Sequence, residues 1–77
     1  MRINILFFGR LADVTGKNSI ELDGIVDTEE LKRRLTDMYP GLAQLNYLTA
    51  VEREVITANI KLEDKVTVAL LPPFSGG

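Results

Sequence analysis

The end of the chain holds the residues whose types and spacing point most directly to chemistry. Pro72-Pro73 is followed by Phe74, Ser75 and a terminal glycine pair, Gly76-Gly77. At the usual glycine content of roughly 7%, a terminal pair arises by chance about once in 200 sequences. The two prolines have a fixed φ and lack an N–H donor, so they form a stiff, extended spacer. The sequence therefore predicts a tail that presents its end away from the folded body.

A tail of this kind makes the backbone carboxyl group of Gly77 the candidate reactive group. Because glycine has no side chain, Gly76 and Gly77 can thread a channel in another protein where a Cβ would collide with the walls. A free carboxylate is a poor acyl donor, but an acyl-adenylate has a good leaving group and an electrophilic carbonyl carbon. The simpler interpretation is a frayed or engineered end, since chain termini are commonly disordered.

The side chains of the sequence offer no comparable catalyst. Cys and His are both absent, which excludes disulfides, thiolate metal sites and the usual general base near neutral pH. Ser75 has no His or Lys beside it to activate its hydroxyl, so we expect it to be a spacer. Asp27 and Glu30 have the spacing of a capped helix start, which favours capping over acid–base catalysis. We predict that this chain binds no metal and no cofactor.

The charged residues do not indicate a nucleic-acid partner. Nine basic and eleven acidic residues give a formal charge of −2, and the basic ones are scattered along the chain. We expect the run Lys32-Arg33-Arg34 to be a solvated helix face, with contact to an acidic partner as the minor alternative. Asn4 and Gly9 interrupt what would be a signal sequence, and no apolar run reaches the roughly 18 residues of a membrane span. We expect a soluble, cytoplasmic protein with no membrane partner.

A short series of elements must position the tail. Ile3, Ile5 and Phe7 alternate with their neighbours as in a strand with one buried face. A helix is predicted after its N-cap, Asp27, with an apolar stripe that continues past Pro40-Gly41, where the helix ends. The stripe consists of Leu31, Leu35, Met38 and Leu42. Further strands are expected at 19–22, 48–51, 55–57 and 66–71, with irregular chain at 42–48 and no more than one helical turn at 10–15.

This order predicts an α+β fold of the ubiquitin-like β-grasp type. One main helix packs across a mixed sheet, because a single helix can bury its stripe only against that sheet. A ferredoxin-like fold would require a second helix of comparable length. At 77 residues the chain is short for more than one domain. We predict a β-grasp domain at 1–71 and a flexible C-terminal tail at 72–77.

Strand alternation also predicts an exposed apolar face next to the tail. If Phe7 points toward the helix, Phe8 must point away from it, and the same reasoning places Leu71 on the outer face. The two lie close together if the first and last strands are neighbours. A cluster of exposed apolar side chains beside a presented tail suggests a docking face.

Several segments together resemble a known family. These are residues 2–9, the capped helix at 27–35, Thr49-Ala50-Val51 and, above all, the ending at 70–77. They resemble the small subunit of molybdopterin synthase, a ubiquitin-like sulfur carrier, over essentially the whole chain. The form Pro-Pro-x-x-Gly-Gly is more similar to that carrier than to the thiazole-synthesis carrier, which usually lacks Pro-Pro.

The resemblance implies a sulfur-transfer cycle in which the terminal carboxyl group of Gly77 carries the sulfur atom. An adenylating enzyme of the ubiquitin-activating type uses ATP to adenylate Gly77, and a sulfur-donor enzyme supplies the sulfur for a thiocarboxylate. The tail then enters the large subunit of molybdopterin synthase, which inserts the sulfur into cyclic pyranopterin monophosphate. Two small and two large subunits form the assembled synthase. ATP, and zinc where present, belong to the activating enzyme.

The resemblance also adds Val55 to Phe8 and Leu71 on the docking face, and we expect a partner pocket for Phe74.

Relatives often have Arg in place of Ala12, Asn in place of Glu52, and an Asp-Gly-Asp turn where Lys65 stands. The first two departures affect expected partner contacts, and the third affects the entry to the last strand.

Two other functions stay open at this point. One is a ubiquitin-like conjugation or interaction module whose Gly77 forms an isopeptide bond or which only docks. The other is a sulfur carrier for thiazole, cysteine or another sulfur-containing product. The prolines favour the molybdopterin pathway over the latter, but pathway choice resides in the partner that receives the tail.

Overall fold

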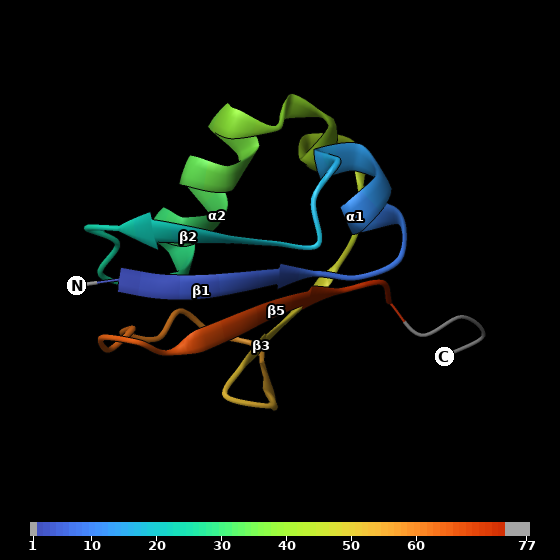
Figure 1. Cartoon of the computed structure of the whole chain (residues 1–77). Coiled ribbons are helices and arrows are strands. Elements are labelled where there is room, and N and C mark those ends of the chain that lie inside the picture. The colour runs from blue at the N-terminus through green and yellow to red at the C-terminus, as the bar shows by residue number, and fades with distance from the viewer. Residues whose placement is uncertain (1, 74–77) are drawn as a thin grey trace.

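The structure is a computed structural model that describes residues 2–73 of the chain. Within this range the backbone forms five strands, two α-helices and one 3-10 helix (Figure 1). Their bounds are β1 (Arg2–Phe7), α1 (Arg10–Thr15), β2 (Ser19–Asp23), α2 (Thr28–Met38), η1 (Pro40–Gln44), β3 (Leu48–Val51), β4 (Glu54–Ile56) and β5 (Thr67–Leu71).

The strands form one mixed sheet in the order β2-β1-β5-β3-β4. The central strands β1 and β5 run parallel, and the other neighbouring pairs are antiparallel. Both α-helices lie on the same side of this sheet (Figure 1). The predicted ubiquitin-like β-grasp architecture is therefore confirmed, and the first and last strands are neighbours, the condition on which Phe8 and Leu71 lie close together.

The core is built on alternating residues of the two central strands. Ile5 pairs with Val68 and Phe7 with Leu70, so their side chains form adjacent rows on the face that the helices cover. All four side chains are buried, as is Ile3. The alternation read from the sequence is confirmed for β1 and β5. Burial of such apolar surface is the main favourable contribution to folding.

Helix α2 packs its stripe on these rows, but the stripe is shorter than predicted. Leu31 and Leu35 are fully buried, whereas Met38 is 45% exposed. The chain leaves the helix after Met38, and extended backbone at Tyr39 (φ −131°) turns it away. Tyr39 then packs edge-on against Phe7 with ring centroids 6.0 Å apart, so Tyr39 contacts the core while Met38 is exposed.

Two short helical segments differ from the sequence-based expectation. Residues 40–44 were expected to end the helix and enter irregular chain, but they form η1, which begins at Pro40 and buries Leu42. Proline suits the first turn of a helix because its missing N–H has no partner there. Helix α1 is six residues long, slightly longer than one turn, and buries Leu11 and Thr15 while Val14 is exposed.

The different roles of Leu35 and Met38 are open to a direct test. Leu35→Ala should lower the free energy of unfolding by about 2–5 kcal/mol, because it leaves a cavity in the core. Met38→Ala should change it by no more than about 0.5 kcal/mol, as is usual at an exposed site. Urea unfolding followed by circular dichroism measures both. Equal losses in the two variants would contradict the packing of α2 described above.

Candidate functional site

The residues predicted to react lie beyond the part of the chain that the structure describes. Gly76 and Gly77, together with Phe74 and Ser75, fall outside residues 2–73, so their predicted roles and the predicted division at 71/72 stay predictions. Strand β5 ends at Leu71, and the exposed Pro72 and Pro73 follow it directly. The candidate site is therefore the surface around the point where the chain leaves the sheet.

Pro72 packs against the turn that follows β1. The N–H of Phe8 donates to the carbonyl oxygen of Leu70 at 3.2 Å, which continues the pairing of β1 and β5 to this end of the sheet. Gly9 comes next, with φ of +57°, and a Cβ at this position would lie 2.7 Å from Cγ of Pro72. Glycine is needed here both for the left-handed backbone and for the close approach of the proline ring.

Phe8, Val55 and Leu71 lie around one hollow on the outer face of the sheet, with a volume of about 500 Å³. Phe8 is 44% and Val55 49% exposed, and Leu71 is half-buried. The structure thus brings together the three residues predicted to form the docking face, although it does not test what binds there. Leu71 both lines the hollow and precedes Pro72, so this face adjoins the exit of the tail.

The hollow results from a row of paired residues that crosses four strands. Leu6 pairs with Ala69, Ala69 with Ala50, and Ala50 with Val55. Because the two middle residues are alanines and the outer two are larger, the centre of the row lies lower than its ends. The sequence analysis missed Leu6, Ala50 and Ala69. Alternation alone assigned each to a face, but only the strand register shows that they form one row.

Polar residues border this hollow on the side of the β3–β4 turn. Glu52, Arg53 and Thr67 complete its lining. The N–H of Glu52 donates to the carbonyl oxygen of Thr67 at 3.0 Å, and the carboxylate of Glu52 accepts from the N–H of Thr67 at 3.3 Å. The turn is therefore fastened to β5.

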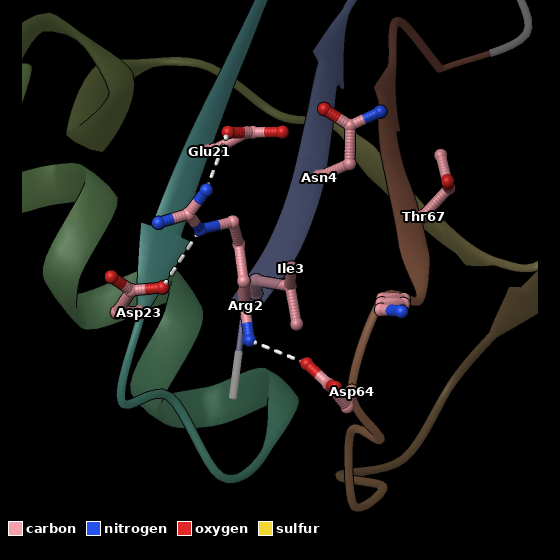
Figure 2. A pocket seen from close by; sticks show the side chains of 8 residues that line it. Arg2, Ile3, Asn4, Glu21, Asp23, Asp64 and Thr67 are labelled. Carbon is pink, nitrogen blue, oxygen red and sulfur yellow. Dashed lines mark hydrogen bonds and ion pairs between the residues drawn. The ribbon is translucent and has the colours of Figure 1, made fainter.

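A second hollow, of about 760 Å³, lies at the opposite end of the central strands. Figure 2 shows Arg2 between Glu21 and Asp23, with contacts of 3.5 Å and 3.2 Å, and its backbone nitrogen directed to Asp64 at 2.8 Å. The hydrogen bond that the Arg2 guanidinium donates to the Asp23 carboxylate, and the negative charge of that carboxylate, raise the pKa of Arg2. These side chains are more than half exposed, and exposed ion pairs contribute little to stability. We assign this cluster to the attachment of β1 to its neighbours.

The carboxylate pair Asp27 and Glu30 caps α2. A side-chain oxygen of Asp27 accepts from the N–H of Glu30 at 2.9 Å, as predicted. The carboxylate of Glu30 accepts from the N–H of Val26 at 2.9 Å, one residue before the position that a standard capping box uses. The Glu30 N–H and, secondly, the Asn59 side chain lower the pKa of Asp27. Its carboxylate is therefore ionised near neutral pH and has a structural role.

The structure supports no second chemical site in residues 2–73. Lys32, Arg33 and Arg34 are exposed on α2, as expected for a solvated face. Over the same range, no three His, Cys, Asp or Glu side chains gather in a way that suits a metal ion. None of the helices formed by residues 2–73 has the length and apolar character required to span a bilayer.

Comparison with known proteins gives matches over nearly the whole chain. The model of the ThiS family matches residues 5–77. The molybdopterin synthase sulfur carrier subunit of Caenorhabditis briggsae is 32% identical over 97% of this chain and 96% of that protein. The subunit of the same name from Dictyostelium discoideum is 34% identical over 99% of this chain and 96% of that protein.

Solved structures share the fold at lower sequence identity. Small archaeal modifier protein 1 from Methanosarcina acetivorans is 21% identical, with a TM-score of 0.85 over 99% of this chain and 96% of that one. The complex of subunits 1 and 2 of the molybdopterin-converting factor from Helicobacter pylori contains a chain that is 24% identical, with a TM-score of 0.74 over the full length of both. These matches support the β-grasp architecture described above.

The lowered pKa of Asp27 predicts how the cap depends on pH. Its ordinary value is 3.8, so the contribution of the ionised cap to stability is fully present above about pH 4 and is lost as pH falls through the lower, folded-state pKa. Asp27→Asn retains a good N-cap that does not titrate. The stability of the wild-type protein relative to this variant should therefore decrease below pH 4. Urea unfolding at pH 7 and pH 3 measures it, and a constant difference would contradict the assignment.

Proposed function

Because this chain belongs to the ThiS family, with residues 5–77 matching the family model, we propose that it is the sulfur-carrier subunit of a molybdopterin synthase. The relatives that are 32% and 34% identical over almost their full length carry that name. The ending Pro72-Pro73 to Gly76-Gly77 supports the molybdopterin pathway over thiazole or cysteine synthesis. The finding on which the proposal depends most is the position of the apolar hollow directly beside the exit of the tail.

In the proposed reaction the chain contributes its terminal carboxylate. An adenylating partner transfers AMP from ATP to the carboxylate of Gly77 and releases pyrophosphate. Sulfur that a donor enzyme delivers at the oxidation level of sulfide attacks the carbonyl carbon and displaces AMP, which leaves a thiocarboxylate. In the synthase, the sulfur passes to cyclic pyranopterin monophosphate and water restores the carboxylate. The chemistry of activation lies in the partners, where ATP binds.

The folded domain positions that terminus for its partners. Phe8, Val55 and Leu71 offer a partner an apolar surface, and burying such surface is favourable for association. Because Leu71 is followed directly by Pro72, a partner that covers the hollow is placed at the start of the tail. Two glycines at the end then allow the carboxylate to enter a narrow active site, with Phe74 bound in a pocket before it.

The expected assembly contains the large subunit of molybdopterin synthase, with two small and two large subunits. The solved Helicobacter pylori complex contains subunits 1 and 2 of a molybdopterin-converting factor, which supports a partner of this class. A conjugation module is the competing function, since a modifier protein from Methanosarcina acetivorans shares the fold. Intact-mass analysis of the protein from its own cells separates the two, because a thiocarboxylate replaces one oxygen by sulfur whereas conjugation attaches a whole protein.

Deleting Gly77 should abolish sulfur transfer without affecting the fold. The fold described for residues 2–73 does not include Gly77, whereas its carbonyl carbon is the reacting atom of the proposed function. Molybdopterin formation is measured in a mixture of the chain, large subunit, activating enzyme, ATP and a sulfur source. A residue added after Gly77 should be equally damaging because it moves the reacting carbonyl. If the truncated protein supported the reaction, the carrier function would be wrong.

Phe8→Asp should weaken binding to the large subunit far more than it changes the melting temperature, because Phe8 is exposed on the outer face. Ile5→Val is the matched control, since it removes one methyl group from the buried face of β1, the strand that ends just before Phe8. That change should cost about 0.5–1.5 kcal/mol of stability and leave affinity unchanged. Calorimetric titration measures Kd for both. Normal binding by Phe8→Asp would remove the hollow from the proposed interface.

A further inference from the structure

The turn between β3 and β4 holds two residues in an unfavourable backbone conformation. Glu52 has φ of +49° and Arg53 of +72°, and Val51 pairs with Glu54 on either side. Two-residue hairpin turns of this kind favour Asn and Gly, because other side chains are strained at positive φ. Strain of this kind is concentrated at functional sites when the surrounding structure maintains it.

The surrounding structure holds this turn firmly. The two hydrogen bonds between Glu52 and Thr67, at 3.0 Å and 3.3 Å, attach it to β5. The carboxylate of Glu52 is thus already used within the chain. The backbone of Arg53 is therefore fixed relative to the hollow that Phe8, Val55 and Leu71 line.

Unlike the carboxylate of Glu52, the side chain of Arg53 makes no polar contact with another residue of the described chain. It is exposed on the border of the hollow, and within residues 2–73 its guanidinium forms no ion pair and no hydrogen bond. Arg53 is also the one basic side chain among the residues that line this hollow. A cation whose backbone is held by the turn thus stands at the edge of an apolar surface.

We propose that Arg53 is a specificity residue of the docking face and that its guanidinium pairs with a carboxylate on the protein that covers the hollow. The inference rests on the proposed function, because it takes the large synthase subunit as that protein. The matching surface would have an apolar centre and an Asp or Glu at its edge. Arginine suits this role because its planar group binds a carboxylate through two parallel hydrogen bonds. Charge pairs at the edge of an interface mainly set the register and rate of association.

The strain provides a test that separates binding from folding. Arg53→Gly removes both the charge and the strained side chain, and Lys65→Gly does the same at a third residue with positive φ, +66°, away from the hollow. Both should keep or raise the melting temperature, since relief of strain offsets the greater freedom of glycine in the unfolded chain. Only Arg53→Gly should weaken binding, by about three- to fivefold. Arg53→Glu should weaken it roughly tenfold or more.

The measurement is calorimetric titration of the full chain with the purified large synthase subunit of the same organism at low and high salt. Wild-type affinity should fall as salt rises, Arg53→Lys should retain most of it, and Arg53→Gly should lose the salt dependence. Equal affinities for Arg53→Gly and Lys65→Gly would overturn the proposal, as would a lower melting temperature in Arg53→Gly alone. Self-association of the chain through this face would also overturn it. If Phe8→Asp binds the large subunit normally, the docking face of the proposed function is wrong. That result differs from one in which only the Arg53 variants bind normally.

Discussion

The parallel pairing of β1 with β5 is the contact on which the rest of the structure depends. It joins the two ends of the described chain and places Ile5 beside Val68 and Phe7 beside Leu70. Without these rows, α2 has no apolar surface to cover. Pairing two strands that are distant in sequence costs chain entropy. Burial of both apolar rows offsets this cost. It also fixes where the chain leaves the sheet.

One register serves both faces of the sheet. The residues between the core positions, such as Leu6 and Ala69, are paired by the same ladder but point away from the helices. On that side the row continues through Ala50 to Val55, and its small central residues produce the hollow. Because the helices cover the other face, the end of this row at Val55 remains accessible, whereas Ala50 is buried at its centre. A substitution that shifted the register would therefore damage the core and the docking face together.

Three residues with positive φ lie near this face. Gly9 allows the close approach of the Pro72 ring where the tail begins. Glu52 and Arg53 have positive φ at the border of the hollow. Lys65, the remaining non-glycine residue with positive φ among residues 2–73, lies two residues before the start of β5 and does not line this hollow. These positions fix the turn beside the hollow and the point where the chain leaves the sheet.

The sequence by itself determined the local features: the alternation of Ile3, Ile5 and Phe7, the Asp27 cap and the stop at Pro72-Pro73. These follow from side-chain period, capping chemistry and a missing N–H donor, which act over a few residues. Only the tertiary structure decided that Tyr39 packs against the core while Met38 is exposed, and that the outer residues form one concave row. Both depend on where the chain turns after α2 and on strand register, which are set by contacts between distant segments and leave no local signal in the sequence.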